Sequence, residues 1–433
     1  MHKGGNMEKE TTVYTKNGVA IYGYKNPSLH SFYISLFIKA GSMYEEERES
    51  GITHFLEHSI IRNVNSQMQG QLYRQLDLHG VEFNASTYSE MVQLYAYGAS
   101  ESFSFAADIF SLALSPIVLS GDDIAAERDR IKAEIREADD RTSLATFTQG
   151  IVHEGTSLSR PILGTLGSVS RITASKLEKY RRRVIGKDNI FFYVTGSYTD
   201  EDIAYLSELV GKAELYCGEA RNNVAPVADR FFRRDGAVHL KNADFTMLRF
   251  NFDMDMSRLS LPATDLLYDL LLSGYNSRLF IEMSERRGLF YDLNGAVERY
   301  KNIGSFTFSY ELRPDAVYTA TEITLSILSE LCTRLLTEEE CMKAGYVKNA
   351  YMLYDDPREL NFTFAYDNHI LDNGYLSLSD RADRYRAVTP ELLRSTAREI
   401  FTRDNLTLTV KGNKRKIDTE RLASIIRDGL KFD

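Results

Sequence analysis

The chain has 433 residues, of which 43% are hydrophobic and 26% charged, and its formal net charge is −9. This is the composition of a globular protein with a sizeable core, and the length predicts about two to three domains. The acidic balance, without a clustered basic patch, gives no sign of nucleic-acid binding.

The cysteines and the N-terminal segment bear on location. Cys217, Cys332 and Cys341 form no CxxC pair, which fits a reducing compartment better than a disulfide framework. The N-terminal segment has neither an apolar stretch nor an arginine-rich amphipathic one, so we expect no signal or transit peptide. No segment approaches the ~18 uninterrupted apolar residues of a membrane span. We therefore expect a cytoplasmic protein.

In the first half, strand and helix patterns alternate. Residues 13–24 contain Asn17-Gly18, a strong hairpin-turn signal, and residues 32–40 predict a second strand. Further elements are expected as follows: helices at 51–62 and 69–79, the second closed by Gly80; strands within 83–97; two or three helices between 100 and 140; and a strand at 189–194.

The second half repeats this order, with strands expected within 237–254 and 291–312 and helices at 263–272, 277–286 and 316–336. Asp188-Asn189-Ile190 matches Asp404-Asn405-Leu406, and Gly80-Val81-Glu82-Phe83 matches Gly288-Leu289-Phe290-Tyr291. We interpret this as a duplication. The expected fold is α+β, with two homologous domains at 8–216 and 236–433, each an antiparallel-rich sheet packed with helices. The low-periodicity stretch 217–235 is the expected linker.

The stretch from Gly51 to His58 carries a candidate metal site. On a helix, His54 and His58 are four residues apart and project from one face, with Glu57 on the same side. Two imidazoles at this spacing can hold one Zn²⁺, and the adjacent carboxylate can deprotonate a water. HxxEH is the inverted form of the HExxH zinc motif. The alternative is an amphipathic helix with two incidental histidines.

A third ligand is available on the helix expected at residues 123–138. At about 100° per residue, Glu127 and Glu134 both fall beside its apolar stripe, while Glu137 falls about 60° further round, toward solvent. Either of the first two glutamates can therefore reach an interior site. The alternative is that both are surface charges beside a core helix.

With these residues in view, the sequence resembles the M16 metallopeptidases, which include pitrilysin, insulin-degrading enzyme and the mitochondrial processing peptidase. The resemblance covers nearly the whole chain. It is carried by Asn17-Gly18, Gly41-Ser42, Glu45, Gly51, the HxxEH stretch, Asn84-Ala85-Ser86-Thr87, Pro161, Gly164-Thr165, Asp188-Asn189, Ser277-Arg278-Leu279-Phe280 and Gly288-Leu289-Phe290-Tyr291.

The resemblance implies roles for these residues. The family places its third zinc ligand at the position of Glu134, and a second glutamate, here Glu127, seven residues earlier; Glu127 would orient a histidine or tune the metal. One Zn²⁺ per chain is implied, with Glu57 as the base. Asn84, Ala85, Ser86 and Thr87 match the edge strand that pairs with substrate.

The length is similar to that of the smaller M16B subunits, which hold two homologous domains and pair as a clamshell around a closed chamber. The family often carries an arginine seven residues before the tyrosine at position 291, and both contact substrate at the opposite zinc. Here Tyr291 is present, but Ser284 stands at the arginine position. Arg286 and Arg287 point elsewhere if this stretch is helical. The second domain has no histidine where Asp265–Leu272 matches the zinc helix.

These departures imply a heterodimer with a second M16-like subunit that lacks HxxEH and supplies the arginine and tyrosine; a homodimer is the alternative. The implied activity is that of a zinc endopeptidase acting on short unfolded peptides, as in leader-peptide or bacteriocin maturation. The alternatives are presequence processing, a housekeeping oligopeptidase, and a non-catalytic structural subunit like the core proteins of a respiratory complex. The missing transit peptide favours a bacterial protein over a mitochondrial one.

Overall fold

The computed structural model describes residues 10–141, 143–216, 236–273, 276–341, 345, 347 and 351–430, without the side chains of 139–141, 143 and 291. The expected linker 217–235, with Cys217, lies outside the described residues. Among the residues that are described, no helix is long and apolar enough to cross a membrane.

The chain divides into two compact units that exchange segments. The first comprises residues 1–141, 157–225 and 352–377, and the second residues 142–156, 226–351 and 378–433. The domains expected at 8–216 and 236–433 are each one continuous stretch, whereas each compact unit is built from three segments of the chain.

Within the described part of the first unit, six strands form a mostly antiparallel sheet. They are β1 (Thr11–Tyr14), β2 (Ala20–Lys25), β3 (Ser31–Ile38), β4 (Glu82–Thr87), β5 (Val92–Ala99) and β6 (Ile190–Gly196). Their order is β1-β2-β6-β3-β5-β4, and β2 and β6 run parallel. The strands β1 and β4 are therefore the two edges of the sheet.

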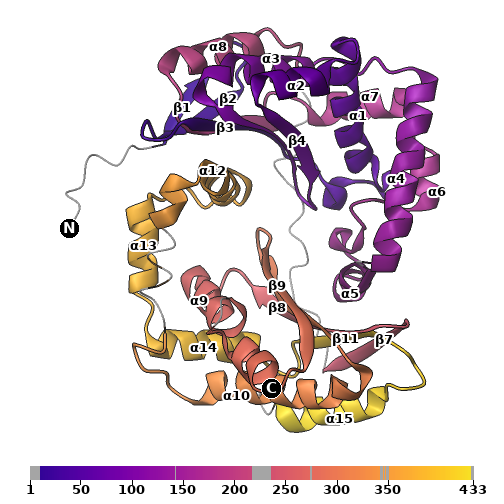
Figure 1. Cartoon of the computed structure of the whole chain (residues 1–433), viewed down its shortest axis with the longest axis vertical. Helices are drawn as coiled ribbons and strands as arrows, with labels where there is room; N and C mark the ends of the chain where they lie inside the picture. The colour runs from indigo at the N-terminus through magenta and orange to yellow at the C-terminus, as the bar shows by residue number, and fades with distance from the viewer. Residues whose placement is uncertain are drawn as a thin grey trace. The chain divides into compact units, whose positions relative to one another are not determined.

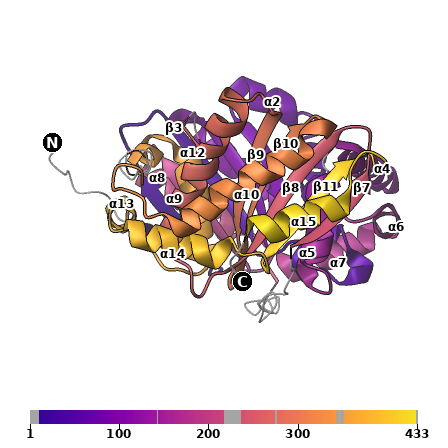
Figure 2. The same cartoon turned by 90° about the horizontal axis from the view of Figure 1, so that it is seen from below.

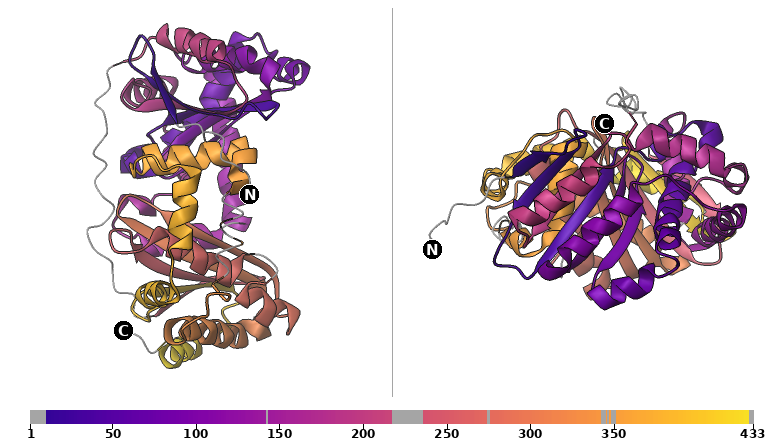
Figure 3. Two further views of the ribbon diagram at one scale, coloured as in Figure 1. Left: turned by 90° about the vertical axis from the view of Figure 1, so that its left-hand side faces the viewer. Right: turned by 90° about the horizontal axis from the view of Figure 1, so that it is seen from above.

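One face of this sheet forms the hydrophobic core with the helices that follow. Because side chains alternate along a strand, Phe32, Ile34, Leu36 and Ile38 of β3 all point to this face. The helices are α1 (Ile52–Gln67), α2 (Leu72–His79), α3 (Phe103–Ala113), α4 (Gly121–Arg141), α6 (Leu166–Ser170), α7 (Ala174–Val184) and α8 (Asp200–Gly211). Figure 3 (right) shows α8, α3 and α2 laid across the strands.

The opposite face is aromatic and receives the segment 352–377. This segment holds α12 (Pro357–Ala365) and the π-helical turn η8 (Tyr366–Ile370), seen beneath the strands in Figure 1. Asn361 Nδ2 donates to Tyr193 O at 2.8 Å, and the ring of His369 stacks on Tyr22 at 3.6 Å. A segment from the second half of the sequence thus completes the first unit.

The second unit contains β7 (Ala237–Asn242), β8 (Thr246–Asp255), β9 (Phe290–Arg299), β10 (Ile303–Leu312) and β11 (Leu406–Gly412), in the order β7-β11-β8-β10-β9. Its helices are α5 (Ser143–Val152), α9 (Leu261–Leu272), α10 (Val317–Thr333), α13 (Leu378–Arg386), α14 (Pro390–Ile400) and α15 (Thr419–Gly429). Helices α10, α14 and α15 lie side by side over this sheet (Figure 2).

Short 3-10 or π turns occur in both units, at Ser42–Tyr44, Glu47–Glu49, Ser100–Ser102, Ser157–Ser159, Phe280–Glu285, Pro314–Ala316 and Leu353–Asp355.

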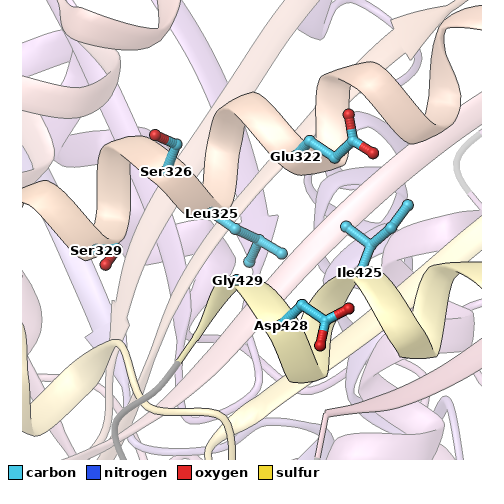
Figure 4. Close-up of a pocket in the computed structure, with 7 residues that line it drawn as sticks. All are labelled: Glu322, Leu325, Ser326, Ser329, Ile425, Asp428 and Gly429. Carbon is cyan, nitrogen blue, oxygen red and sulfur yellow. The ribbon is translucent and has the colours of Figure 1, made fainter.

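Helix α15 packs closely on α10 because it ends in a glycine. A Cβ on Gly429 would lie 2.8 Å from Leu325 Cδ1, so a larger residue would push the helices apart. Beside this contact lies a pocket of ≈ 390 Å³ that presents Glu322 from α10 and Asp428 from α15 (Figure 4).

The two sheets show the repeat expected from sequence. In the order β2, β6, β3, β5, β4 the first sheet matches β7, β11, β8, β10, β9 strand for strand, including the single parallel pair. The matched asparagines have the same contacts. Asn189 Nδ2 donates to Val184 O (2.7 Å) and Lys39 O (3.1 Å), while Asn405 Nδ2 donates to Ile400 O (2.8 Å) and Asp253 O (2.7 Å). The α+β fold with two sheet-and-helix units is confirmed.

Most expected elements are present, with shifted ends. Helix α1 continues to Gln67, five residues beyond the expected end, and α2 begins only at Leu72. The helix expected at 277–286 is instead the π-helical turn Phe280–Glu285, here called η5.

Candidate metal centre

The start of α1 is fixed by a glycine and a buried carboxylate. Gly51 has φ 87°, and a Cβ there would meet Leu163 O at 2.7 Å, so the position requires glycine. The Glu45 carboxylate accepts hydrogen bonds from the backbone N–H groups of Gly51 (2.8 Å) and Thr53 (2.9 Å). It thereby satisfies amide groups that a helix N-terminus leaves open.

Helices α1 and α4 bring two imidazoles and a carboxylate together. His58 Nε2 is 3.5 Å from Glu134 Oε2, and His54 Nε2 is 3.8 Å from the same oxygen. One ligand atom from each residue lies within 4.8 Å of the others. The side chains of both histidines are only 10% exposed, whereas that of Glu134 is 34% exposed and borders solvent.

This donor set fits zinc. Two imidazole nitrogens and one carboxylate oxygen are ligands of catalytic zinc, which keeps a fourth position open. Ligand atoms of a tetrahedral zinc are about 3.3 Å apart. The two observed separations to Glu134 Oε2, 3.5 and 3.8 Å, are close to that value.

Glu127 supports His58 rather than completing the cluster. Its Oε2 is 3.1 Å from His58 Nδ1, on the ring edge opposite the nitrogen that faces Glu134. Its Oε1 accepts a hydrogen bond from Arg62 Nη1 at 2.7 Å, and Arg62 Nε donates to Asp123 Oδ1 at 3.0 Å. A carboxylate on the outer nitrogen fixes the tautomer and ring orientation of a ligating histidine.

Burial and hydrogen bonding set the titration of these groups in the metal-free protein. Burial, together with the neighbouring His58, lowers the pKa of His54 to about 4. Burial also acts to lower the pKa of His58, but hydrogen bonds to Glu127 and Glu134 outweigh it and raise that pKa to about 9. The hydrogen bond from His58 lowers the pKa of Glu134. The two imidazoles are therefore in different electrostatic environments.

Glu57 lies beside the cluster on α1, and its residue is only 8% exposed. Its Oε2 accepts a hydrogen bond from Thr87 Oγ1 at 2.5 Å. Burial raises the pKa of Glu57, and the Thr87 hydrogen bond opposes this. A buried carboxylate adjacent to a candidate metal is placed as a general base would be.

The other expected site residues are placed as follows. Asn84, Ala85, Ser86 and Thr87 lie on β4, an edge of the sheet. Tyr291 lies in β9, but its side chain is outside the description. Ser284 lies in η5, and the nearby Arg286 and Arg287 both pair with Glu282. Both guanidinium groups are therefore held by Glu282 and do not replace an arginine at position 284.

Sequence reasoning missed Arg62. It lies one helical turn after His58 on α1, and Asp123 lies one turn before Glu127 on α4, so these pairs could have been recognised as facing rows. The arginine joins α1 and α4, the two helices of the candidate metal cluster, through charge-assisted hydrogen bonds.

Two sheet-and-helix units, one of them with a helix-borne His-His-Glu cluster, are the arrangement of a metalloprotease class. The family model for insulinase (peptidase family M16) matches residues 21–166, and the model for the peptidase M16 inactive domain matches residues 171–344. The chain therefore belongs to the M16 peptidase family.

Bacterial relatives carry zinc-protease names. An uncharacterized zinc protease of Rickettsia felis is 26% identical over 335 residues, covering 76% of this chain and 79% of that protein. One from Mycobacterium tuberculosis is 23% identical over 420 residues, covering 92% and 93%. YmxG of Bacillus subtilis is 23% identical over 393 residues, covering 90% and 95%.

Solved structures share the fold. A protease from Helicobacter pylori has a TM-score of 0.81 at 17% identity, covering 94% of this chain and 100% of that chain. The periplasmic protease PqqL from Escherichia coli has a TM-score of 0.77 at 17% identity, covering 98% and 50%. A chain of complex III2 from Candida albicans has a TM-score of 0.74 at 15% identity, covering 96% and 99%.

Proposed function

We propose that this chain is the zinc-bearing subunit of an endopeptidase that hydrolyses short, unfolded peptides. The observation that carries the proposal is the cluster of His54, His58 and Glu134 with the buried Glu57 beside it. In this proposal His54, His58 and Glu134 hold one Zn²⁺, and Glu127 keeps His58 oriented through its outer nitrogen.

The chemistry proposed is hydrolysis of a peptide bond. Bound zinc would polarise the scissile carbonyl and make a water easier to deprotonate. Glu57 takes a proton from the attacking water as the C–O bond forms. Glu57 then gives this proton to the amine as the C–N bond breaks. Proton transfer at one carboxylate thus serves both halves of the reaction.

The substrate is proposed to bind as an extended strand along β4. This strand is a sheet edge, and addition of a strand to an edge is held mainly by backbone hydrogen bonds. Such binding selects for an extended conformation more than for sequence. It favours flexible peptides, such as a leader segment of a ribosomal peptide or bacteriocin precursor.

We further propose that the chain acts with a second M16-like subunit and in the cytoplasm of a bacterium. The serine at position 284 supports the proposal of a partner subunit, because no arginine stands there and the neighbouring Arg286 and Arg287 are both paired with Glu282. A homodimeric oligopeptidase is the second candidate. A non-catalytic structural role is less well supported, since such a role does not require the cluster and base that this chain keeps.

The test is the Glu57→Gln variant in zinc-loaded protein, assayed on an unfolded peptide. We expect zinc content and fold to be kept and the rate to fall by more than about a hundredfold, because Thr87 and the cluster remain but the base is lost. A rate above about a tenth of wild type would show that Glu57 is not the base.

A further inference from the structure

Thr87 occupies a position that joins the edge strand to the proposed base. Side chains alternate along β4, so Thr87 shares a face with Phe83 and Ala85, which pack on the core beneath α1. Asn84 and Ser86 belong to the other face. The Thr87 hydroxyl is therefore directed at α1, where it donates to Glu57 Oε2 at 2.5 Å.

The backbone of Thr87 is directed elsewhere. Tyr88 N donates to Met91 O at 2.8 Å, so Tyr88 and Met91 form a hydrogen-bonded pair at the end of the β4–β5 hairpin. Pairs alternate in an antiparallel ladder, so Thr87 and Val92 form a non-hydrogen-bonded pair. The amide and carbonyl of Thr87 consequently point away from β5, to the open edge.

The same alternation applies to Ala85, and a contact agrees with it. The N–H of Ala85 is not used by the ladder and instead donates to Asn84 Oδ1 at 2.8 Å. The Thr87 N–H is thus directed to the open edge, where an extended peptide can engage it.

Within the described residues, Thr87 is the hydrogen-bond partner of the Glu57 carboxylate. Without this donor the carboxylate could rotate about its side-chain torsions, and a misplaced base loses much of its rate advantage.

We propose that Thr87 is a positioning residue: its hydroxyl holds Glu57 in line with the attacking water, and its backbone binds the peptide, so that docking on β4 and alignment of the base are coupled. The inference rests on the proposed peptidase function. In this proposal the Thr87 side chain contacts the base Glu57, whereas Asn84, Ala85 and Ser86 contact only the peptide substrate.

The experiment compares Thr87→Val, which keeps the shape but cannot donate, with Thr87→Ser, which keeps the hydroxyl. Thr12→Val is the matched control, because Thr12 is an exposed threonine on β1, the opposite edge of the same sheet. All are assayed as zinc-loaded protein under the conditions in which wild type is active, beside Glu57→Gln. Zinc content and the visible spectrum of cobalt-substituted protein are measured in parallel.

We expect Thr87→Val to lower kcat roughly ten- to a hundredfold with KM within about twofold of wild type. Thr87→Ser should restore most of kcat, and Thr12→Val should match wild type. The cobalt spectrum should not change, because Thr87 touches no proposed ligand.

Three outcomes overturn the proposal: an unchanged kcat in Thr87→Val, a rise in KM with kcat unchanged, or a lost zinc or altered cobalt spectrum in Thr87→Val. A wild-type-like rate in Glu57→Gln would instead refute the proposed function, and with it the coupling. Since that result is read from a separate variant, the two failures are distinguishable.

Discussion

At the scale of single residues, the glutamates of α4 differ in what they touch although they share one helix. Glu134 faces both histidines, and Glu127 faces the outer nitrogen of His58. Glu137 is exposed. Their effects on zinc should therefore form a graded series.

We predict that purified wild-type protein holds about one Zn²⁺ per chain. His58→Ala and Glu134→Gln should lose it, because each removes a ligand. Glu127→Gln should weaken affinity by roughly ten- to a hundredfold, as expected for loss of a group that orients a ligand. Metal analysis and competition with a chelator measure the series.

Glu137→Gln is the matched control on the same helix and should bind zinc as wild type does. Equal zinc loss in the Glu137 and Glu134 variants would refute the ligand assignment.

At the scale of elements, a buried carboxyl joins the β4–β5 turn to the segment that covers the aromatic face. Glu90 is 6% exposed and accepts a hydrogen bond from Tyr366 of η8. Burial raises the pKa of Glu90 to about 7, although the hydrogen bond from Tyr366 opposes this. The folded state therefore binds this proton more tightly than the unfolded chain does.

The sign of the pH dependence follows from that difference. Between the unfolded value near 4.5 and the folded value near 7, the native state holds more protons, so stability falls as pH rises through this window. We predict that Glu90→Gln removes this loss, which amounts to at most about 3 kcal/mol. At pH 8 the variant should be more stable than wild type, and at pH 4 the advantage should vanish.

Thermal unfolding of zinc-free protein across this pH range measures the effect. Glu101→Gln, which changes an exposed carboxylate of the same unit, should follow the wild-type curve. A constant difference between Glu90→Gln and wild type at all pH values would contradict the explanation.

The segment 352–377 also shows why elements cannot be assigned to a unit by sequence order. Asn361 donates to Tyr193 O at 2.8 Å, and Thr195 Oγ1 donates to Pro357 O at 2.5 Å. These bonds satisfy buried polar groups on β6, more than 150 residues away in the chain. A fragment ending at the expected linker would leave this face of the sheet uncovered.

At the scale of the whole molecule, the zinc-type cluster is confined to one of two homologous units within the described residues. Helix α9 stands where α1 stands in the repeat, and its Asp265 pairs with Arg299 and accepts a hydrogen bond from Tyr385 at 2.7 Å. In the second unit, the helix equivalent to α1 therefore uses its acidic side chain in contacts within the fold.

We predict that the chain is weakly active alone and gains activity with a second M16-like subunit that carries an arginine at the position of Ser284. A serine hydroxyl is short and uncharged, and it cannot replace the reach or the paired donors of a guanidinium. Without a guanidinium that contacts the peptide from the side facing the proposed zinc site, an extended peptide is positioned less well for attack by water. Copurification followed by peptidase assays of each subunit and of the mixture measures this.

Ser284→Arg provides a test that needs no partner. If the missing guanidinium limits a homodimer, this variant should gain activity alone. Full activity of the wild-type chain by itself, unchanged by any added subunit, would show that the lost arginine is tolerated.

Features that depend on local spacing could be predicted from the amino-acid sequence alone. Histidines four residues apart on a helix share a face whatever the rest of the chain does. The repeated Asp-Asn pattern identified the strands that correspond in the two halves. The sequence also narrowed the third ligand to Glu127 or Glu134, because both lie beside the apolar stripe of one helix.

Which groups meet across the fold depends on how the elements pack, and this could not be predicted from local patterns. Helix packing directs Glu134 at both histidines and Glu127 at the outer nitrogen of His58, and it brings Arg62 between the helices. It also places Thr87 on Glu57, 30 residues away, and carries segment 352–377 back to the first sheet. Such contacts depend on how helices and strands pack, and packing is set by the whole core rather than by any local period.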